Sequence, residues 1–304
     1  MVEGGAPHGW LILDKPRGLG STQAVGAVKR NLREAGYGKV KVGHGGTLDP
    51  LAEGLLPIAL GEATKLAGRM LDSDKIYDFT ISFGEETSTL DTEGEVVASS
   101  DHRPSRDSVE AVLPRFTGPI EQVPPAYSAL KVDGQRAYDR ARAGEVVELA
   151  TRPVTIHALD LLEAADGHAT LRAHVSKGTY IRSLARDIAR AVGSWGHVTY
   201  LRRIKVGPFV AGQAISLDKL NEIGKGARLQ DYLLPLEAGL DDIPALALDP
   251  TSAQAVRQGR ELSGLPPESY RADGLHFAKL ADVPIALVEI VGGTARVVRG
   301  FNLS

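Results

Sequence analysis

Apolar and polar residues alternate with the period of a strand in several parts of the chain. In "KIYDFTISFG" the side chains of Tyr77, Phe79, Ile81 and Phe83 fall on one face, which predicts a half-buried strand. "GWLILDKP" predicts a short buried strand that ends at Pro16, and "HVTYLRRIKVGPF" predicts another alternating strand. "GLLPIALG", "PVTIHALDLLEA" and "ATLRAHVS" add three more strands to a largely antiparallel sheet.

Two other stretches have the period of a helix. "STQAVGAVKRNLREAG" predicts a helix with Ser21 or Thr22 as its N-cap, because both are good capping residues. "GTYIRSLARDIARAVG" predicts a helix on which Arg182, Arg186 and Arg190 share one face. Strands and helices together indicate an α+β protein with a mixed, mainly antiparallel sheet.

The composition changes near residue 240, where "DYLLPLEAGLDDIPALALDP" is acidic and contains three prolines. This change predicts a boundary near Pro244. Residues 1–240 then form one large domain, and residues 245–304 form a small module with one short helix and several strands. The β-rich pattern of this module is clearest in "PIALVEIVGGTARVVRG".

Composition places the chain among soluble globular proteins. Its 304 residues are 43% apolar and 24% charged. There is no cysteine, which excludes disulfides and thiolate metal sites and agrees with a reducing compartment. We find no signal-peptide pattern at the start and no apolar run of the ~18 residues that a membrane helix needs. The sequence therefore predicts a cytoplasmic protein that does not bind a membrane.

Basic residues are segregated along the chain although the net charge is −3. Residues 15–41 contain seven lysines and arginines against one acid, and residues 172–205 contain eight against one. Such segregation produces a basic face suited to a polyanion such as a nucleic acid. The alternative is two ordinary solvated helix faces.

Several common catalytic motifs are missing. The stretch "GLGSTQ" lacks the third glycine of a dinucleotide-binding loop, and no GK[ST] motif is present. The eight histidines show no HExxH motif and no paired spacing, which predicts that there is no metal site. No GxSxG motif supports a serine nucleophile.

The most unusual stretch is "VGHGGTLDPLAEGLLPIALGEATK", which places Asp49 after a glycine-rich turn. Taken alone, an Asp before Pro commonly caps a helix or begins a turn, and the glycines permit positive φ angles. Taken with five other blocks in order, however, it resembles the TruB family of transfer-RNA pseudouridine synthases. The other blocks are "LDKPRGLGS", "KIYDFTISFGEETSTLDTEG", "PPAYSALKVDGQRAYDRARAG", "KGTYIRSLARDIA" and "HVTYLRRIKVGPF".

The resemblance covers about residues 9–210 and carries the family's fold and activity as expectations. It implies a pseudouridine synthase catalytic domain in residues 1–240, with an RNA-contacting insertion near 125–150. It also implies a PUA-like RNA-binding domain in residues 245–304. The expected reaction converts the uridine at position 55 in the T-arm loop of tRNA to pseudouridine, without a cofactor. The expected partner is the T-arm stem-loop, bound by a monomer.

The resemblance also implies roles for individual residues. Asp49 is expected to be the essential carboxylate, acting by attack at C1′, addition at C6 or deprotonation at C2′. Tyr77 is expected to stack on the flipped base and Arg182 to pair with Asp49. The expected RNA contacts are His44, in the space vacated in the RNA loop, and Tyr180, Leu201, Lys131 and Lys15.

Two other functions fit parts of this pattern. A tRNA-binding chaperone that folds the T-arm, with secondary or no catalysis, would use the same basic surfaces. A guide-RNA-dependent relative of the family would act inside a multi-protein particle. The presence of Asp49, Tyr77 and Arg182 together favours catalysis, and the compact chain without lysine-rich tails favours the stand-alone enzyme.

Overall fold

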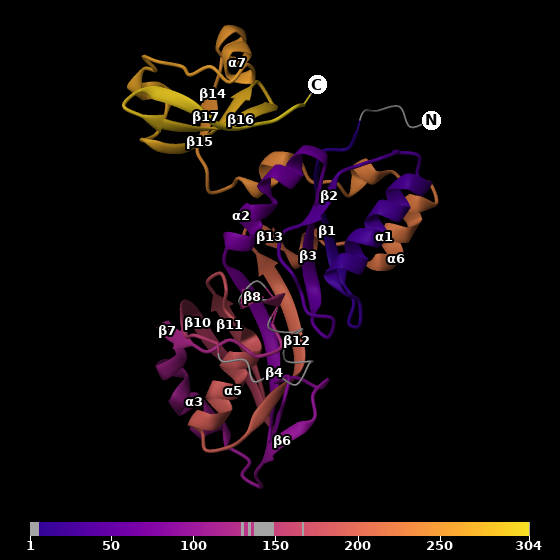
Figure 1. Ribbon diagram of the computed structural model, residues 1–304, viewed down its shortest axis with the longest axis vertical. Helices are drawn as coiled ribbons and strands as arrows, with labels where there is room; N and C mark the ends of the chain where they lie inside the picture. Colours follow the sequence, from indigo (N-terminus) through magenta and orange to yellow (C-terminus); the bar gives the residue numbers. More distant parts are fainter. Residues whose placement is uncertain (1–5, 129–130, 133–134, 137–148, 166, 304) are drawn as a thin grey trace. The chain divides into compact units, whose positions relative to one another are not determined.

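The computed structural model describes residues 6–128, 131–132, 135–136, 149–165 and 167–303. The chain divides into two compact units, each built from separate segments of sequence (Figure 1). The first unit comprises Met1–Leu48, Leu56–Leu71 and Pro208–Ser304, and the second comprises Asp49–Leu55 and Asp72–Gly207. Among the helices of the described residues, none combines the length and the apolar character needed to cross a membrane.

The second unit is built on an antiparallel sheet with β4 (Lys75–Phe83) near its centre. Strands β12 (Gly196–Val206) and β11 (His168–Val175) pair with its two edges, and both run antiparallel to it. Strand β10 (Arg152–Ala165) follows β11, and β7 (Gly118–Gln122) follows β10. The beginning of β3 (Glu53–Leu60) lies parallel to β12. The predicted α+β class with a mainly antiparallel sheet is therefore confirmed.

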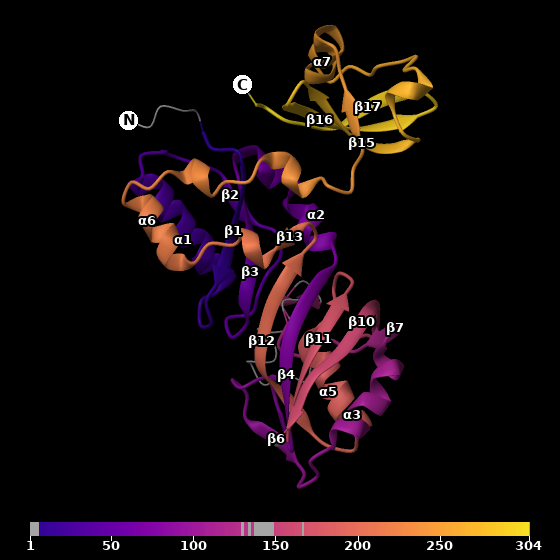
Figure 2. The ribbon, with the colours of Figure 1, turned by 180° about the vertical axis from the view of Figure 1, so that it is seen from behind.

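Two helices, α5 (Ile181–Ala191) and α3 (Arg106–Val112), cover one face of this sheet, as both views show (Figure 1 and Figure 2). The alternation predicted for β4 holds, because Phe79, Ile81 and Phe83 are buried against these helices. Burial of each such side chain contributes about 1.5–3 kcal/mol. The short 3-10 turn η2 (Leu113–Phe116) extends α3. The sheet face that carries Tyr77 is therefore the helix-covered face.

Short elements complete the second unit. Strands β5 (Glu85–Thr87) and β6 (Val96–Ser99) form a two-stranded ribbon. In the predicted insertion near 125–150, β8 (Lys131–Val132) pairs with β9 (Gln135–Arg136). Most of the other residues of this insertion, 129–130, 133–134 and 137–148, lie outside the described residues.

The first unit begins with β1 (Gly9–Lys15), which pairs with β3, while β2 (Val42–His44) pairs with the end of β3. Helix α1 (Ser21–Glu34) packs beside α6 (Leu217–Gly224), and Asn31 donates a hydrogen bond to Asn221 at 3.1 Å. The remaining elements are η1 (Gly61–Leu66), α2 (Ala67–Asp72), β13 (Phe209–Val210), η3 (Ala211–Gln213), η4 (Leu229–Asp231) and η5 (Leu236–Gly239).

The end of the chain forms its own sheet. Strands β14 (Ala245–Ala247), β15 (Gly274–Leu280), β16 (Val283–Val291) and β17 (Thr294–Gly300) pair in this order. Helix α7 (Pro250–Arg257) begins at Asp249, whose carboxylate accepts backbone hydrogen bonds, and the turn η6 (Pro267–Ser269) follows. A separate apolar cluster, including Leu246, Val256 and Ile285, lies inside this sheet and helix.

Candidate active site

Glycines shape the turn that leads to Asp49. A Cβ atom on Gly45 would lie only 2.5 Å from the Cβ atom of Met70, so no larger residue fits there. Gly46 has φ 121°, in the region that favours glycine. The backbone N–H of Gly45 donates to the Pro57 carbonyl at 2.8 Å. The glycine-rich motif therefore reflects a close approach of the backbone to its neighbours and one positive φ angle.

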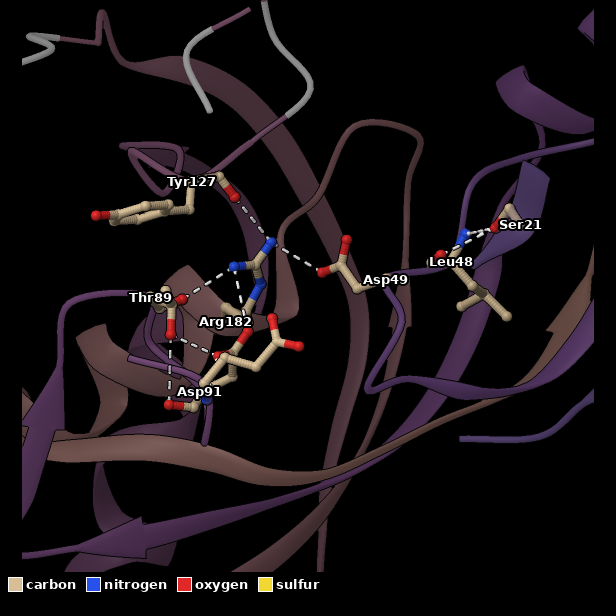
Figure 3. Close-up of polar contacts among 8 residues, drawn as sticks. Ser21, Leu48, Asp49, Thr89, Asp91, Tyr127 and Arg182 are labelled. Atoms are coloured by element: carbon tan, nitrogen blue, oxygen red, sulfur yellow. Dashed lines mark hydrogen bonds and ion pairs between the residues drawn. The ribbon is translucent and has the colours of Figure 1, made fainter. Parts of the chain in front are cut away.

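A serine fixes the residue that precedes Asp49. Ser21 Oγ donates to the Leu48 carbonyl at 2.9 Å and accepts from the Leu48 N–H at 2.8 Å (Figure 3). The prediction that Ser21 or Thr22 caps α1 was wrong, because Gly20 occupies the N-cap position. The Gly20 N–H is satisfied instead by the Gln23 side chain at 2.8 Å. The hydroxyl of Ser21 is thus used to hold the Asp49 loop.

The Arg182 guanidinium lies at the centre of the site and holds the Asp49 carboxylate. Its Nη2 atom lies 2.8 Å from Asp49 Oδ2 and donates to the Tyr127 carbonyl at 3.1 Å. Its Nη1 atom donates to the Thr89 carbonyl at 2.9 Å and lies 3.4 Å from Asp91 Oδ2 (Figure 3). The Arg182 side chain is 8% exposed, whereas that of Asp49 is 44% exposed. The predicted pairing of Arg182 with Asp49 is present in the structure.

Asp91 is a second carboxylate of this network, and sequence reasoning did not identify it. Its side chain is 10% exposed. Oδ1 accepts hydrogen bonds from Thr89 Oγ1 and from the Glu93 N–H, which leaves Oδ2 toward Arg182. The sequence feature that could have identified Asp91 is its place in "STLDTEG", which is part of a block that carries the family resemblance. Asp91 thus holds Arg182 from the side opposite to Asp49.

This arrangement presents one half-exposed carboxylate to solvent from a rigid support. Charge-assisted hydrogen bonds are stronger and shorter than neutral ones, and a planar guanidinium fixes direction as well as distance. Because four acceptors surround the guanidinium, Arg182 has little freedom to move. The Asp49 carboxylate therefore has a defined orientation and remains accessible to a substrate.

The first turn of α5 is held by Gln122, another residue that sequence reasoning missed. Its buried amide accepts from the Tyr180 N–H at 2.8 Å and donates to the Tyr180 carbonyl at 3.1 Å. Ser183 Oγ donates to the Val123 carbonyl at 2.8 Å. These bonds fix the residues on both sides of Arg182. The Tyr180 ring lies under the Arg152 guanidinium, 5.6 Å from it.

The other predicted site residues lie on several elements. Tyr77 on β4 and Leu201 on β12 are half-buried and pack against the apolar core. Within the described residues, no hydrogen bond joins Tyr77 to Asp49. His44 ends β2 in the first unit, and its backbone pairs with Ile58. Lys131 lies in β8.

Lys15 is placed where it cannot contact a phosphate. It is 0% exposed, and its Nζ atom donates to the Pro16 carbonyl at 3.1 Å and the Leu19 carbonyl at 2.6 Å. The expectation that Lys15 binds RNA is therefore not met in this structure. Its ammonium group instead closes the loop between β1 and α1.

The arginine face of α5 is also not a free basic surface. Arg186 Nε pairs with Asp187 at 2.8 Å, and Arg190 makes two contacts with Glu86, at 2.7 and 3.0 Å. Like Arg182, both side chains are neutralised by carboxylates of the protein. Helical spacing predicted the shared arginine face but not these acidic partners, which reduce the net positive charge of the face.

The basic cluster of the first unit is different. Lys29, Arg33 and Lys39 are exposed and line a groove of about 380 Å³. Among the residues that the structure describes, none of these three forms an ion pair. Unpaired cations beside a groove attract a polyanion.

Lys75, two residues before Tyr77, is the one lysine near the sheet core with a strongly shifted pKa among the described residues. Burial of its ammonium group, and secondarily the positive charge of Arg203, lowers the pKa of Lys75 to about 8. Lys75 Nζ donates to the Ser73 carbonyl at 2.5 Å. The protonation midpoint of Lys75 thus lies near pH 8, well below that of an ordinary lysine.

Comparison with known proteins places the whole chain in one family. Residues 32–181 match "TruB family pseudouridylate synthase (N terminal domain)", and residues 182–241 match "tRNA pseudouridylate synthase B C-terminal domain". A tRNA pseudouridine synthase B from Novosphingobium aromaticivorans is 67% identical over 97% of both chains. One from Zymomonas mobilis is 60% identical over 98% of this chain and 97% of its own.

Solved structures show the same fold. A chain of the solved structure described as "Crystal Structure of a Cbf5-Nop10-Gar1 Complex" is 26% identical to this chain and superposes with a TM-score of 0.75. The match covers 97% of this chain and 85% of the other. The α+β architecture with its mainly antiparallel sheet agrees with this match. The chain therefore belongs to the TruB family of pseudouridine synthases.

Proposed function

We propose that Asp49 is the essential group with which this tRNA pseudouridine synthase converts uridine 55 of the tRNA T-loop to pseudouridine. The observation that carries the proposal is the half-exposed Asp49 carboxylate, held at 2.8 Å by buried Arg182. Such a group is oriented before the substrate arrives, so little reorganisation is needed during the reaction.

The reaction is an isomerisation. The bond between N1 and C1′ breaks, the uracil turns, and C5 bonds to C1′. C5 loses its proton while N1 ends with one, so atoms and electrons balance without an oxidant or reductant. A carboxylate assists this sequence by attack at C1′, by addition at C6 or by removal of the C2′ proton. Asp49 suits each role because its side chain is 44% exposed while Arg182 holds Oδ2.

The substrate base must leave its stack to reach Asp49, at a cost of a few kcal/mol. We assign Tyr77 to stack on the extracted base, which returns about 1–3 kcal/mol, and its phenol to the late proton transfer at C5. Leu201 packs on the same core face as Tyr77 and would line the base pocket. His44, Tyr180 and Lys131 would contact the T-arm. The groove with Lys29, Arg33 and Lys39 would contact tRNA phosphates.

We further propose that residues 245–304 form a PUA-like domain that binds tRNA, next to a catalytic domain in residues 1–240. Its own apolar core and four-stranded sheet support this role. We also propose that the enzyme acts as a monomer. We place its action in the cytoplasm, where tRNA is matured and used. Replacement of exposed Arg257 and Arg260 by Glu should weaken tRNA binding in a filter assay; unchanged affinity would contradict the RNA-binding role.

The experiment compares wild type with Asp49→Asn on an unmodified tRNA transcript, in buffer with EDTA and without added cofactor. Pseudouridine is mapped by carbodiimide treatment and primer extension. A stop at the T-loop uridine with wild type alone supports the proposal. A stop of equal strength with Asp49→Asn would exclude an essential role for this carboxylate. No stop from either protein, with tRNA binding retained, would favour the chaperone function instead.

A further inference from the structure

A cluster of three potential metal ligands lies on the second unit, outside the site described above. Asp74 immediately precedes β4, His157 is in β10 and His174 is in β11. The nearest ligand atoms of the three side chains all lie within 4.8 Å of one another. Asp74 Oδ2 lies 3.2 Å from His157 Nε2 and 3.8 Å from His174 Nε2. Two imidazoles and one carboxylate therefore point at a common position.

The fold creates this cluster from residues that are far apart in sequence. Strands β4, β11 and β10 are neighbours in the sheet, and His174 pairs with Ile76 on β4. The register between β10 and β11 shifts between Ile156 and Ala158, at the position of His157. His157 directly follows buried Ile156, so the alternation of the strand places the His157 side chain on the face away from the core. Linear spacing of histidines gave no indication of the site.

The ligand spacing suits a small tetrahedral ion. Two nitrogen or oxygen ligands about 2.0–2.1 Å from zinc, at a tetrahedral angle, lie roughly 3.4 Å apart. The distances from Asp74 Oδ2 to the two histidine Nε2 atoms, 3.2 and 3.8 Å, bracket this value. Imidazole and carboxylate are ligands that zinc accepts, and sites with three protein ligands keep a fourth position for water. Calcium and magnesium are disfavoured, because both prefer oxygen ligands.

The cluster faces away from the apolar core. Its neighbours in β11, Ala173 and Val175, are buried in the core, whereas His174 is half-buried and His157 is exposed. Tyr77 packs against that core, so it lies on the opposite face of the sheet. The exposure of Asp74 and His157 leaves an entry path for an ion and room for water ligands. The cluster is therefore separate from the group of Asp49, Arg182 and Asp91.

The charges around the cluster allow a divalent cation. Asp74 contributes one negative charge to the position between the histidines. Lys205 is a nearby cation that opposes metal binding, and Asp72 is engaged with Lys177 at 2.9 Å. The two histidine rings lie 4.7 Å apart with a 50° tilt, so they are not stacked face to face. Bound zinc would draw both rings and the carboxylate toward one centre.

We propose that Asp74, His157 and His174 bind one zinc ion per chain, with at least one position open to water. The ion joins the start of β4 to β10 and β11. Since Tyr77 is three residues after Asp74, zinc stiffens the strand that carries it without taking part in the reaction. This inference does not depend on the role of Asp49, because zinc binding is measured without tRNA.

The test uses the full chain, treated with EDTA and dialysed against metal-free buffer. Zinc is titrated in competition with a chromogenic chelator, and cobalt(II) is used as a visible probe of four-coordinate geometry. We compare wild type with His157→Gln and His174→Gln. His102→Gln is the matched control, because it removes an exposed histidine elsewhere in the same unit. Circular dichroism without metal verifies that all variants are folded.

Wild type and His102→Gln should bind one zinc per chain. The cluster variants should bind at least about 100-fold more weakly, since loss of even an outer partner of a ligand costs about 10- to 100-fold. Zinc should raise the melting temperature of wild type but not of the cluster variants, because it binds only the folded site. Equal zinc affinity in all four proteins, or no stoichiometric binding to wild type, would overturn the proposal. Asp74→Asn provides a second test if one histidine variant is unfolded.

Discussion

Replacement of Asp91 by Asn removes one charge from the Arg182 network while it preserves side-chain shape. The amide oxygen can still accept from Thr89 Oγ1 and the Glu93 N–H. The amide nitrogen then takes the place of Asp91 Oδ2, which lies 3.4 Å from Arg182 Nη1, so two hydrogen-bond donors face each other. The guanidinium should turn away, and the Asp49 carboxylate that it holds should lose its fixed orientation.

The magnitude follows from the geometry. Two unit charges 3.4 Å apart attract by about 5 kcal/mol at an effective dielectric constant of 20. Most of this is offset by desolvation, and a hydrogen bond to a charged group is worth about 1.5–3 kcal/mol net. We therefore expect a loss of about 2 kcal/mol in transition-state stabilisation, or about 30-fold in kcat. Affinity for tRNA should change little, because Asp91 is buried.

The assay follows release of tritium from C5 of labelled uridine in tRNA under single-turnover conditions, with filter binding for Kd. Glu86→Gln is the matched control. Glu86 is 9% exposed and pairs with Arg190 on the same helix, two turns from Arg182. Both variants should lose stability, but only Asp91→Asn should lose rate. A rate for Asp91→Asn within about two-fold of wild type, or equal losses in both variants, would refute the positioning role.

Three further outcomes follow from the contacts. As the pH rises from 8 to 10.5, wild type should gain about 3 kcal/mol of unfolding free energy relative to Lys75→Met, because Lys75 in the folded state holds fewer protons there than in the unfolded state. Urea unfolding across this pH range measures the difference. The same pH dependence of unfolding free energy in both proteins would contradict it. Lys29→Gln with Arg33→Gln should reduce the salt slope of tRNA binding by about 1.5–2, and an unchanged slope would exclude the groove. Ser21→Ala should cost about 2 kcal/mol in urea unfolding, because it leaves buried Leu48 backbone groups unpaired; a smaller loss than in Thr22→Ala would count against the anchor.

Sequence patterns predicted the elements that have a clear period. The alternation of β4, the buried strand before Pro16 and the amphipathic helix α5 all appear in the structure. Burial of an apolar face contributes strongly to the folding free energy, and the spacing of apolar residues along the sequence shows which face is buried. The resemblance of six ordered blocks then predicted the family and the pairing of Asp49 with Arg182, which spacing alone does not give.

Polar partners were the part that sequence did not predict. Lys15 was predicted to contact RNA and Arg190 to belong to a basic helix face, but loop carbonyls accept from Lys15 and Glu86 pairs with Arg190. Ser21 looked like a helix cap, yet its hydroxyl bonds Leu48. The pairings of Arg190 with Glu86 and of Ser21 with Leu48 join residues that are brought together only by the tertiary fold, whereas Lys15 bonds carbonyls of the loop that follows it. A charged or capping residue has several possible partners of similar free energy, so its local sequence does not select one.

The first unit is discontinuous, and this has a consequence for its synthesis on the ribosome. The indole of Trp10 donates to the carbonyl of Leu236, 226 residues later, and the backbone of β1 also bonds Leu234 and Ile215. At about 5–20 residues per second, translation needs roughly 10–45 s to span that distance. During this time the apolar strand β1 lacks its C-terminal partners. Strand β1 thus leaves the ribosome long before its pairing is complete, and its apolar side chains need chaperone protection in the nascent chain during that interval.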